Sequence, residues 1–123
     1  MNVRDWFLLI GSVALSSAAQ LMIKIGLKGA GGLEFSPAGL RTLLTRIVES
    51  GWLIAGFAAF VASALLWLLV LSRTELSRAY PLVSLGYVFV LLLAHFVLGE
   101  TIPARRLAGV AAIVAGVILI GGS

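Results

Sequence analysis

Two long apolar runs, separated by a short polar turn, make up the segment Leu76–Ser123. The first run, Ala79–Leu98, has His95 as its only strongly polar side chain, and the second extends from about Ile102 to Ile120. A helix rises about 1.5 Å per residue, so about twenty residues cross a hydrocarbon core about 30 Å thick. The polar residues that lipid would reject lie in the turn, residues 99–106. The segment therefore predicts a helical hairpin that crosses a membrane twice.

Composition extends this prediction to the whole chain of 123 residues. Hydrophobic residues make up 61% of the chain and charged residues 11%, whereas a soluble domain has about 25% charged residues. We therefore expect an all-α integral membrane protein, because a helix satisfies its own backbone hydrogen bonds in lipid. The apolar runs are continuous and do not alternate, which argues against a β-barrel.

The charged residues and the lack of cysteine exclude several classes of function. The net charge of +4 does not indicate nucleic-acid binding, because the nine Lys and Arg residues lie mostly at the ends of apolar runs, where they anchor in headgroups. Without cysteine the chain has no disulfide and no thiolate metal site. The sequence offers no nucleophile–base pair and no cluster of metal ligands, so we expect neither an enzyme nor a bound metal or cofactor.

We expect the whole chain, residues 1–123, to form a single four-helix transmembrane domain. The predicted spans cover about residues 5–26, 51–72, 78–98 and 102–121. The N-terminal run also resembles a signal peptide, but its apolar character continues through Ile23 and further spans follow, which favours a first span. Small residues at Gly56, Ala59 and Ser63 would let a neighbouring helix approach the second span.

A short amphipathic helix is predicted between the first two spans, over residues 37–49. A glycine-rich turn covers residues 28–35, after which Ser36 is placed to cap a helix with Pro37 in its first turn. At helical spacing, Leu40, Leu43, Leu44, Ile47 and Val48 share one face, and Arg41, Thr42, Thr45, Arg46 and Glu49 share the other. We expect this helix to lie in the plane of the membrane interface. The alternative is that it extends the second span outward.

The first span is the most polar of the four. Ser12, Ser16, Gln20 and Lys24 recur at every fourth position and therefore share one face of the helix. One interpretation is that the Ser and Gln side chains join neighbouring helices, while Lys24 extends its ammonium group to the interface. The other is that the stripe lines a substrate path, with Lys24 meeting an anionic group at its mouth.

The third span begins with Arg78, Tyr80 and Pro81, and Ser84 follows one turn after Tyr80. Pro81 is expected in the first helical turn, where its missing N–H does little harm. A lone histidine near a helix end is more often a hydrogen-bonded packing residue than a proton carrier. We therefore favour a packing role for His95.

Small residues recur along the fourth span. Ala108, Ala112 and Gly116 are four residues apart, and Gly109 and Gly116 are seven apart. Such spacing lets two helices approach closely in lipid, so we predict that these four residues form a dimer seam. The alternative is tight packing within one subunit.

The distribution of positive charge predicts an orientation. With four spans, both ends of the chain lie on one side of the membrane. That side carries Arg4, Arg73 and Arg78, and the other carries Lys28, Arg41, Arg46, Arg105 and Arg106. The positive-inside rule therefore places both termini outside and the first and third connections in the cytoplasm.

Several of these stretches resemble the drug/metabolite transporter superfamily. The four-span plan, the segment Phe96–Glu100 and the glycine-rich segment Gly109–Val117 resemble its repeated EamA-type signature. Within the superfamily, the chain is most similar to the small subunits of the aminoarabinose–undecaprenyl phosphate flippase. The matching stretches are Ala19–Lys24, Leu66–Leu71 and Ala79–Leu85, and the resemblance weakens across residues 27–50.

The resemblance implies movement of a lipid-linked sugar phosphate between membrane leaflets, usually by a pair of such small subunits. It also implies a relation to small multidrug transporters, which carry an embedded glutamate eight residues before a lysine that resembles Lys24. In this chain that position is Ser16, and no carboxylate lies deep in a predicted span. Export of cations against protons needs a buried carboxylate that exchanges a proton for substrate, so such an exporter is disfavoured.

We therefore expect a transporter subunit of the bacterial inner membrane that forms a homodimer or a heterodimer with a similar small subunit. The candidate substrate-binding residues are Ser16, Gln20, Lys24, Arg78, Tyr80 and Ser84. Their hydroxyl and amide groups are expected to bond to sugar hydroxyls, whereas Lys24 and Arg78 are expected to pair with phosphate. The alternatives are a small multidrug or metabolite exporter and a membrane assembly subunit that transports nothing.

Overall fold

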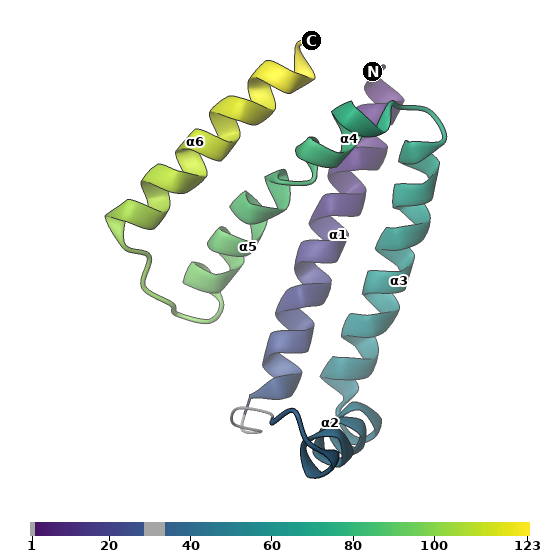
Figure 1. The fold of residues 1–123 in the computed structure, drawn as a ribbon, viewed down its shortest axis with the longest axis vertical. Helices are drawn as coiled ribbons and strands as arrows, with labels where there is room; N and C mark the ends of the chain where they lie inside the picture. The colour runs from purple at the N-terminus through teal and green to yellow at the C-terminus, as the bar shows by residue number, and fades with distance from the viewer. Residues whose placement is uncertain (1, 29–33) are drawn as a thin grey trace.

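The computed structural model describes residues 2–28 and 34–123, and within these ranges the chain forms helices and no strands (Figure 1). The helices are α1 (Val3–Leu27), α2 (Pro37–Glu49), α3 (Gly51–Leu71), α4 (Leu76–Leu82), α5 (Leu85–Phe96) and α6 (Ala104–Gly121). Residues 29–33 of the predicted glycine-rich turn lie outside the described residues. Both chain ends lie at one end of the molecule, the terminal end, and α2 lies at the other, the α2 end.

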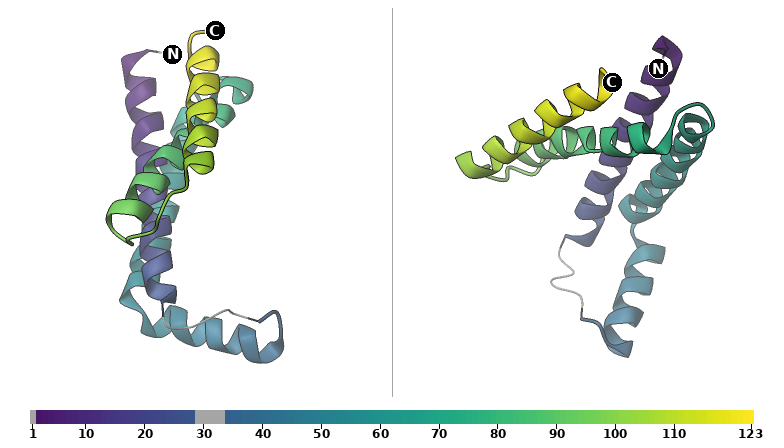
Figure 2. Two further views of the ribbon diagram at one scale, coloured as in Figure 1. Left: turned by 90° about the vertical axis from the view of Figure 1, so that its left-hand side faces the viewer. Right: turned by 45° about the horizontal axis from the view of Figure 1, so that its top comes forward.

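Four segments are long and apolar enough to cross a membrane: α1, α3, α6, and the segment Leu76–Phe96 that contains α4 and α5. The helix α2 lies between the first two, begins at Pro37, and is turned sharply away from the axis of α3 (Figure 2). Its start is set by Ser36, whose Oγ accepts a 3.1 Å hydrogen bond from the Gly39 N–H. The prediction of an all-α membrane protein with four transmembrane helices and a short interfacial helix is confirmed.

The helices α1 and α3 run antiparallel and side by side along most of their length (Figure 1). Small residues allow this close approach. A Cβ atom at Gly56 would lie 2.8 Å from Cγ1 of Ile23, and one at Gly26 would lie 2.6 Å from Cγ of Leu53. Backbones that approach this closely gain van der Waals contact, which is the main source of helix association in lipid.

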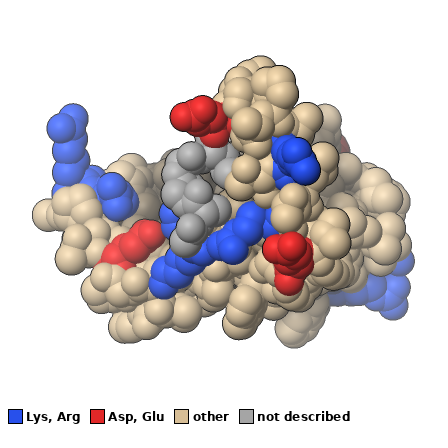
Figure 3. Space-filling model, turned by 90° about the horizontal axis from the view of Figure 1, so that it is seen from below, with Lys and Arg blue, Asp and Glu red and all other residues tan. Residues whose placement is uncertain are grey.

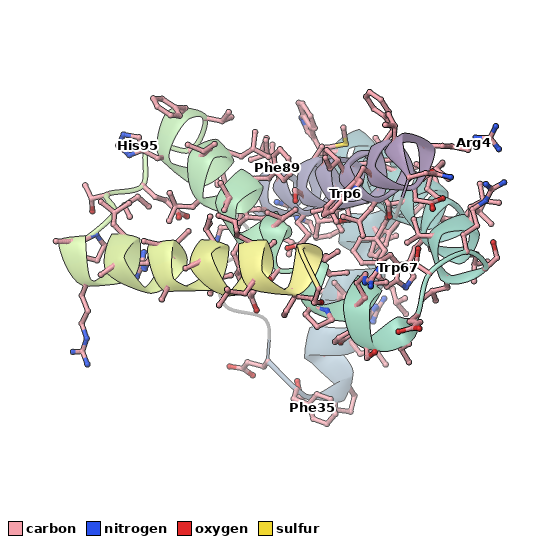
Figure 4. The ribbon with its side chains drawn as sticks, turned by 90° about the horizontal axis from the view of Figure 1, so that it is seen from above. Arg4, Trp6, Phe35, Trp67, Phe89 and His95 are labelled. Atoms are coloured by element: carbon pink, nitrogen blue, oxygen red, sulfur yellow. The ribbon has the colours of Figure 1, made fainter. Side chains whose placement is uncertain are left out.

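The main cluster of buried apolar side chains lies toward the terminal end and joins α1, α3, α4 and α6. Its members are Leu9, Val13, Val70, Ala79, Leu82 and Val117. Trp6, Trp67 and Phe89, which are labelled in Figure 4, pack against it. The helices are therefore held together near the termini, and α5 diverges from α1 toward the α2 end (Figure 1).

The third span is interrupted between α4 and α5, where the sequence predicts one continuous helix with Pro81 in its first turn. The helix begins at Leu76, so Pro81 lies near the end of α4 and well beyond the first turn. Its ring removes a backbone donor and crowds the preceding turn. The N–H groups of Val83 and Ser84 then donate to carbonyls three residues back, each at 3.1 Å, as in a 3₁₀-helix. The break follows from this change of hydrogen-bond register.

The helix α6 packs through its C-terminal end. Over the whole described length of α6, Val117 is the one buried residue. Near the same end, a Cβ atom at Gly121 would lie 3.1 Å from the Trp6 ring. Ile113 and Ile120 are half-buried and pack against the main cluster. Most of the other side chains of α6 are exposed, so in a membrane they face lipid or another subunit.

Candidate functional site

Two adjoining cavities lie between α1 and the third span. The first, the tyrosine cavity, has a volume of about 550 Å³ and includes Ser16, Ser17, Gln20, Tyr80, Ser84 and Tyr87 in its lining. The second, the lysine cavity, has a volume of about 250 Å³ and lies between α1, α5 and the turn after α5. Ser17, Gln20 and Val90 line both cavities. The two cavities therefore form one groove along the span.

The structure brings most of the predicted site residues to this groove. Ser16, Gln20, Tyr80 and Ser84 line the tyrosine cavity, and Gln20 also lines the lysine cavity together with Lys24. Their assignment as substrate-binding residues stays a prediction. What the structure adds is that side chains from α1 and from the third span share one groove.

Arg78 lies apart from the other predicted site residues. It is in α4 at the terminal end, and its Nη2 donates a hydrogen bond to the backbone carbonyl of Ser123. It lines neither of the two cavities. Lys24, in contrast, lies in the last turn of α1 near the α2 end. The two cations therefore lie toward opposite ends of the membrane-spanning region.

Ser12 does not face the groove with the rest of the predicted stripe and instead contacts α3. Its side chain is buried, and its Oγ donates a 3.0 Å hydrogen bond to the backbone carbonyl of Ser63 in α3. Ser12 thus has the helix-joining role that is one of the two interpretations of the stripe. Ser16, Gln20 and Lys24 face the groove instead.

The serine hydroxyls in the groove already donate hydrogen bonds to backbone carbonyls of their own span. Ser16 Oγ and Ser17 Oγ both donate to the Val13 carbonyl, at 2.9 and 2.8 Å, and Ser84 Oγ donates to the Pro81 carbonyl. Their oxygens therefore remain available as acceptors. Gln20 is exposed to the groove and brings both a donor and an acceptor. This combination suits a ligand with several hydroxyl groups.

Two aromatic side chains give the groove an amphipathic wall. Tyr80 and Tyr87 are 67% and 62% exposed, and both line the tyrosine cavity. They lie on either side of the break between α4 and α5. An exposed tyrosine offers an apolar ring face and a hydroxyl on the same side chain, which suits a ligand that has both apolar and polar surfaces.

Three polar residues of the groove lining are absent from the predicted site. Ser17 is buried beside Ser16 and lines both cavities, and Tyr87 lies one turn beyond Ser84. Glu100 lies in the turn after α5 and lines the lysine cavity with Lys24. Each has a signal in the sequence that could have indicated it. Ser17 follows Ser16 directly, and Tyr87 lies two helical turns after Tyr80. Glu100 lies in the third connection, which the sequence predicts on the same side of the membrane as the first connection after Lys24.

His95 has a structural role in this turn. Its Nδ1 lies 3.0 Å from the backbone oxygen of Glu100, and its ring contacts Phe96 edge-on with ring centroids 4.9 Å apart. The residue is exposed and points away from the helices in Figure 4. His95 is therefore hydrogen-bonded as expected, but it does not pack between the helices. Within the described residues, no three His, Asp or Glu side chains gather where they could hold a metal ion.

The predicted seam on α6 is uncovered. Ala108, Gly109 and Ala112 are exposed. A Cβ atom at Gly109 or Gly116 would meet nothing within 4 Å. The seam residues therefore have room for a second helix beside them, and their role in a dimer stays a prediction.

Basic side chains gather at the α2 end of the molecule, with acidic side chains between them (Figure 3). Lys28, Arg41 and Arg46 belong to this region, and Arg46 Nη2 donates a hydrogen bond to the Lys28 carbonyl. The apolar side chains Leu40 and Leu44 of α2 are more than half exposed. A helix with exposed apolar side chains on one face and basic side chains on the other is suited to the membrane interface.

Several curated proteins that are similar to this chain are named as subunits of one flippase. A probable 4-amino-4-deoxy-L-arabinose-phosphoundecaprenol flippase subunit ArnF from Erwinia tasmaniensis is 41% identical over 113 residues, covering 90% of this chain and 89% of that protein. The corresponding protein from Proteus mirabilis is 36% identical over 115 residues, covering 90% and 86%. A probable ArnE subunit of the same flippase from Pseudomonas fluorescens is 45% identical over 73 residues, covering 59% and 64%.

No solved structure matches this chain. The family model described as the EamA-like transporter family matches residues 5–122. This range includes all four membrane-spanning segments almost completely, together with α2 and both cavities. The chain therefore belongs to the EamA-like transporter family.

Proposed function

We propose that this protein is a subunit of a flippase that moves undecaprenyl phosphate-linked aminoarabinose between leaflets of the bacterial inner membrane. The observation that carries the proposal is the groove between α1 and the third span, in which polar side chains extend over the second half of a membrane-spanning helix. Polar groups inside a span are costly and usually serve a substrate path or a helix contact. The names of the relatives, matched over 90% of this chain, support the substrate class.

A groove that opens sideways suits a lipid substrate. Both cavities lie at the protein surface and are not enclosed. The polyprenyl tail can stay in the bilayer while the phosphate and sugar move along the polar lining. Gln20, Ser16 and the two tyrosines then exchange hydrogen bonds with sugar hydroxyls, which replaces the water that the headgroup leaves behind. The step is a movement and breaks no covalent bond.

The two separated cations suit the start and the end of this movement. Lys24 pairs with the phosphate at the α2 end of the groove. Arg78 lies outside both cavities and donates to the Ser123 carbonyl, so it pairs with a phosphate only after the headgroup leaves the groove at the terminal end. A single phosphate meets one of them at a time. By the orientation that the charge bias predicts, Lys24 lies at the cytoplasmic side and receives the substrate first.

The working unit is a dimer joined along α6. The uncovered seam of Ala108, Gly109, Ala112 and Gly116 provides a surface on which a second helix can pack closely. The relatives carry two different subunit names, ArnE and ArnF. A pair of two related small subunits therefore fits better than a pair of identical ones.

Native mass spectrometry of the purified protein with undecaprenyl phosphate, with its aminoarabinose derivative and with ordinary phospholipids tests the proposal. We expect a preference for the two undecaprenyl lipids, weakened about tenfold by Lys24→Ala and unchanged by Lys28→Ala. Lys28 is a matched control because it lies at the same end but lines neither cavity. Equal binding of all lipids, together with resistance to quaternary cations on expression, would favour a small multidrug exporter instead.

A further inference from the structure

Lys24 and Glu100 place opposite charges around one cavity. Lys24 comes from the last turn of α1 and Glu100 from the turn that follows α5, and both side chains are exposed and line the lysine cavity. They form no direct ion pair in the described part of the chain. A cavity bordered by an unpaired ammonium and an unpaired carboxylate is complementary to a ligand that carries both charges.

The backbone of the turn fixes the position of Glu100. Its N–H donates a 3.0 Å hydrogen bond to the carbonyl of Ala94, and its carbonyl oxygen lies 3.0 Å from Nδ1 of His95. Gly99 turns the chain before it with a φ of 71°, a conformation that glycine adopts without strain. None of these contacts uses the carboxylate, which is therefore free for a ligand.

Glu100 differs from the other carboxylates in its position at the groove. Asp5 is buried at the terminal end, and its Oδ2 accepts from the Asn2 N–H. Among the described residues, Glu100 is the one carboxylate in the lining of the lysine and tyrosine cavities. A cationic group that enters the groove from the α2 end therefore meets Glu100 first.

We propose that Glu100 binds the ammonium group of a zwitterionic lipid headgroup whose phosphate pairs with Lys24. This inference rests on the proposed function, since a 4-amino sugar attached to a phosphate presents one positive and one negative charge. With the phosphate held by Lys24, the sugar nitrogen extends into the cavity toward Glu100. Glu100 thereby acts as the residue that selects the aminated lipid over analogues whose sugar carries no ammonium group.

A competition experiment by native mass spectrometry tests this assignment. The purified chain is offered equal amounts of two lipids, undecaprenyl phosphate linked to aminoarabinose and the same lipid with the amine formylated, which removes its charge. We expect the wild-type protein to prefer the amine about twofold to fivefold, as for an exposed ion pair. Glu100→Gln should reduce this ratio to about one, and Glu100→Asp should keep a preference.

Glu49→Gln is the matched control, because Glu49 is an exposed carboxylate at the same end and lines neither cavity. It should retain the wild-type ratio. A wild-type protein with no preference, or a Glu100→Gln variant that keeps the full preference, would overturn the role of Glu100 while the flippase proposal stands. If the wild-type protein bound neither lipid better than uncharged undecaprenol, both proposals would fall. Folding of Glu100→Gln is expected to be normal, because only backbone atoms of Glu100 make the contacts of the turn.

Discussion

Ser12 of α1 donates a 3.0 Å hydrogen bond to the backbone carbonyl of Ser63 in α3, and this contact divides the polar stripe of the first span. Residues four apart on a helix are rotated by about 40° relative to each other, so a long stripe drifts around the axis. Ser12 therefore faces α3, whereas Ser16 and Gln20 face the groove. One sequence pattern thus serves both helix packing and the candidate substrate path.

Ser12→Ala and Ser16→Ala should separate these two roles. Ser12→Ala removes an interhelical hydrogen bond and should destabilise the protein by about 0.5–1.5 kcal/mol, with lipid binding unchanged. Ser16→Ala loses only a bond to its own helix, so it should unfold like the wild type and bind the lipid more weakly. Unfolding in detergent and native mass spectrometry measure the two quantities. The opposite pattern, with Ser12→Ala binding weakly, would place Ser12 in the site.

Gly56→Val should destabilise the pairing of α1 and α3. Even a Cβ atom at this position would lie 2.8 Å from Ile23 Cγ1 and 3.1 Å from the carbonyl oxygen of Ala19. Since a backbone oxygen cannot move aside, we expect a loss of about 1–3 kcal/mol in the free energy of unfolding. Gly11→Ala is the control, because a Cβ atom there meets nothing within 4 Å. If Gly56→Val and Gly11→Ala had the same free energy of unfolding, the close contact at Gly56 would be refuted.

Pro81→Ala should restore a backbone donor at the break in the third span. We expect a more continuous helix and an unchanged or higher stability, because proline inside a helix costs about 3 kcal/mol. Lipid binding should weaken, since Tyr80, Pro81, Ser84 and Tyr87 line the same cavity across the break. Thermal unfolding and lipid binding, measured on the same preparation, check both parts. A stable variant with full lipid binding would show that the break is not needed to shape the groove.

Bulky residues in the seam of α6 should separate the two subunits. Gly109→Leu combined with Gly116→Leu fills the space that a partner helix needs, and neither change meets an atom within the chain at the Cβ position. We expect loss of co-purification with the second small subunit or with a second copy, and no loss of folding. Ala111→Leu is a matched control on another face of α6. If the double variant still formed dimers, the interface would not lie on this face of α6.

Local sequence signals predicted the parts of the fold that depend on neighbouring residues. The interfacial helix was predicted over residues 37–49 and is found at Pro37–Glu49. Ser36 as a cap and Pro37 in the first turn define its start within the chain itself. The four spans follow from apolar runs that are long enough to cross the bilayer.

The parts that the sequence left open depend on contacts between distant residues. Helical periodicity alone does not decide which member of a drifting stripe faces α3, and the Ser12 hydrogen bond decides it. The break after Pro81 arose because α4 begins at Leu76, so that Pro81 lies too deep to be harmless. Glu100 was read as a turn residue because its place beside Lys24 depends on how α5 lies against α1.

The central claim is that the groove carries a lipid-linked sugar phosphate across the membrane. Reconstitution into liposomes, with the second small subunit present, allows the appearance of undecaprenyl phosphate-aminoarabinose in the opposite leaflet to be followed over time. We predict translocation by the wild-type protein and by Lys28→Ala, and a rate lowered at least about tenfold in Lys24→Ala and in Gln20→Ala. Translocation at the wild-type rate by a stably folded Lys24→Ala variant would contradict the account.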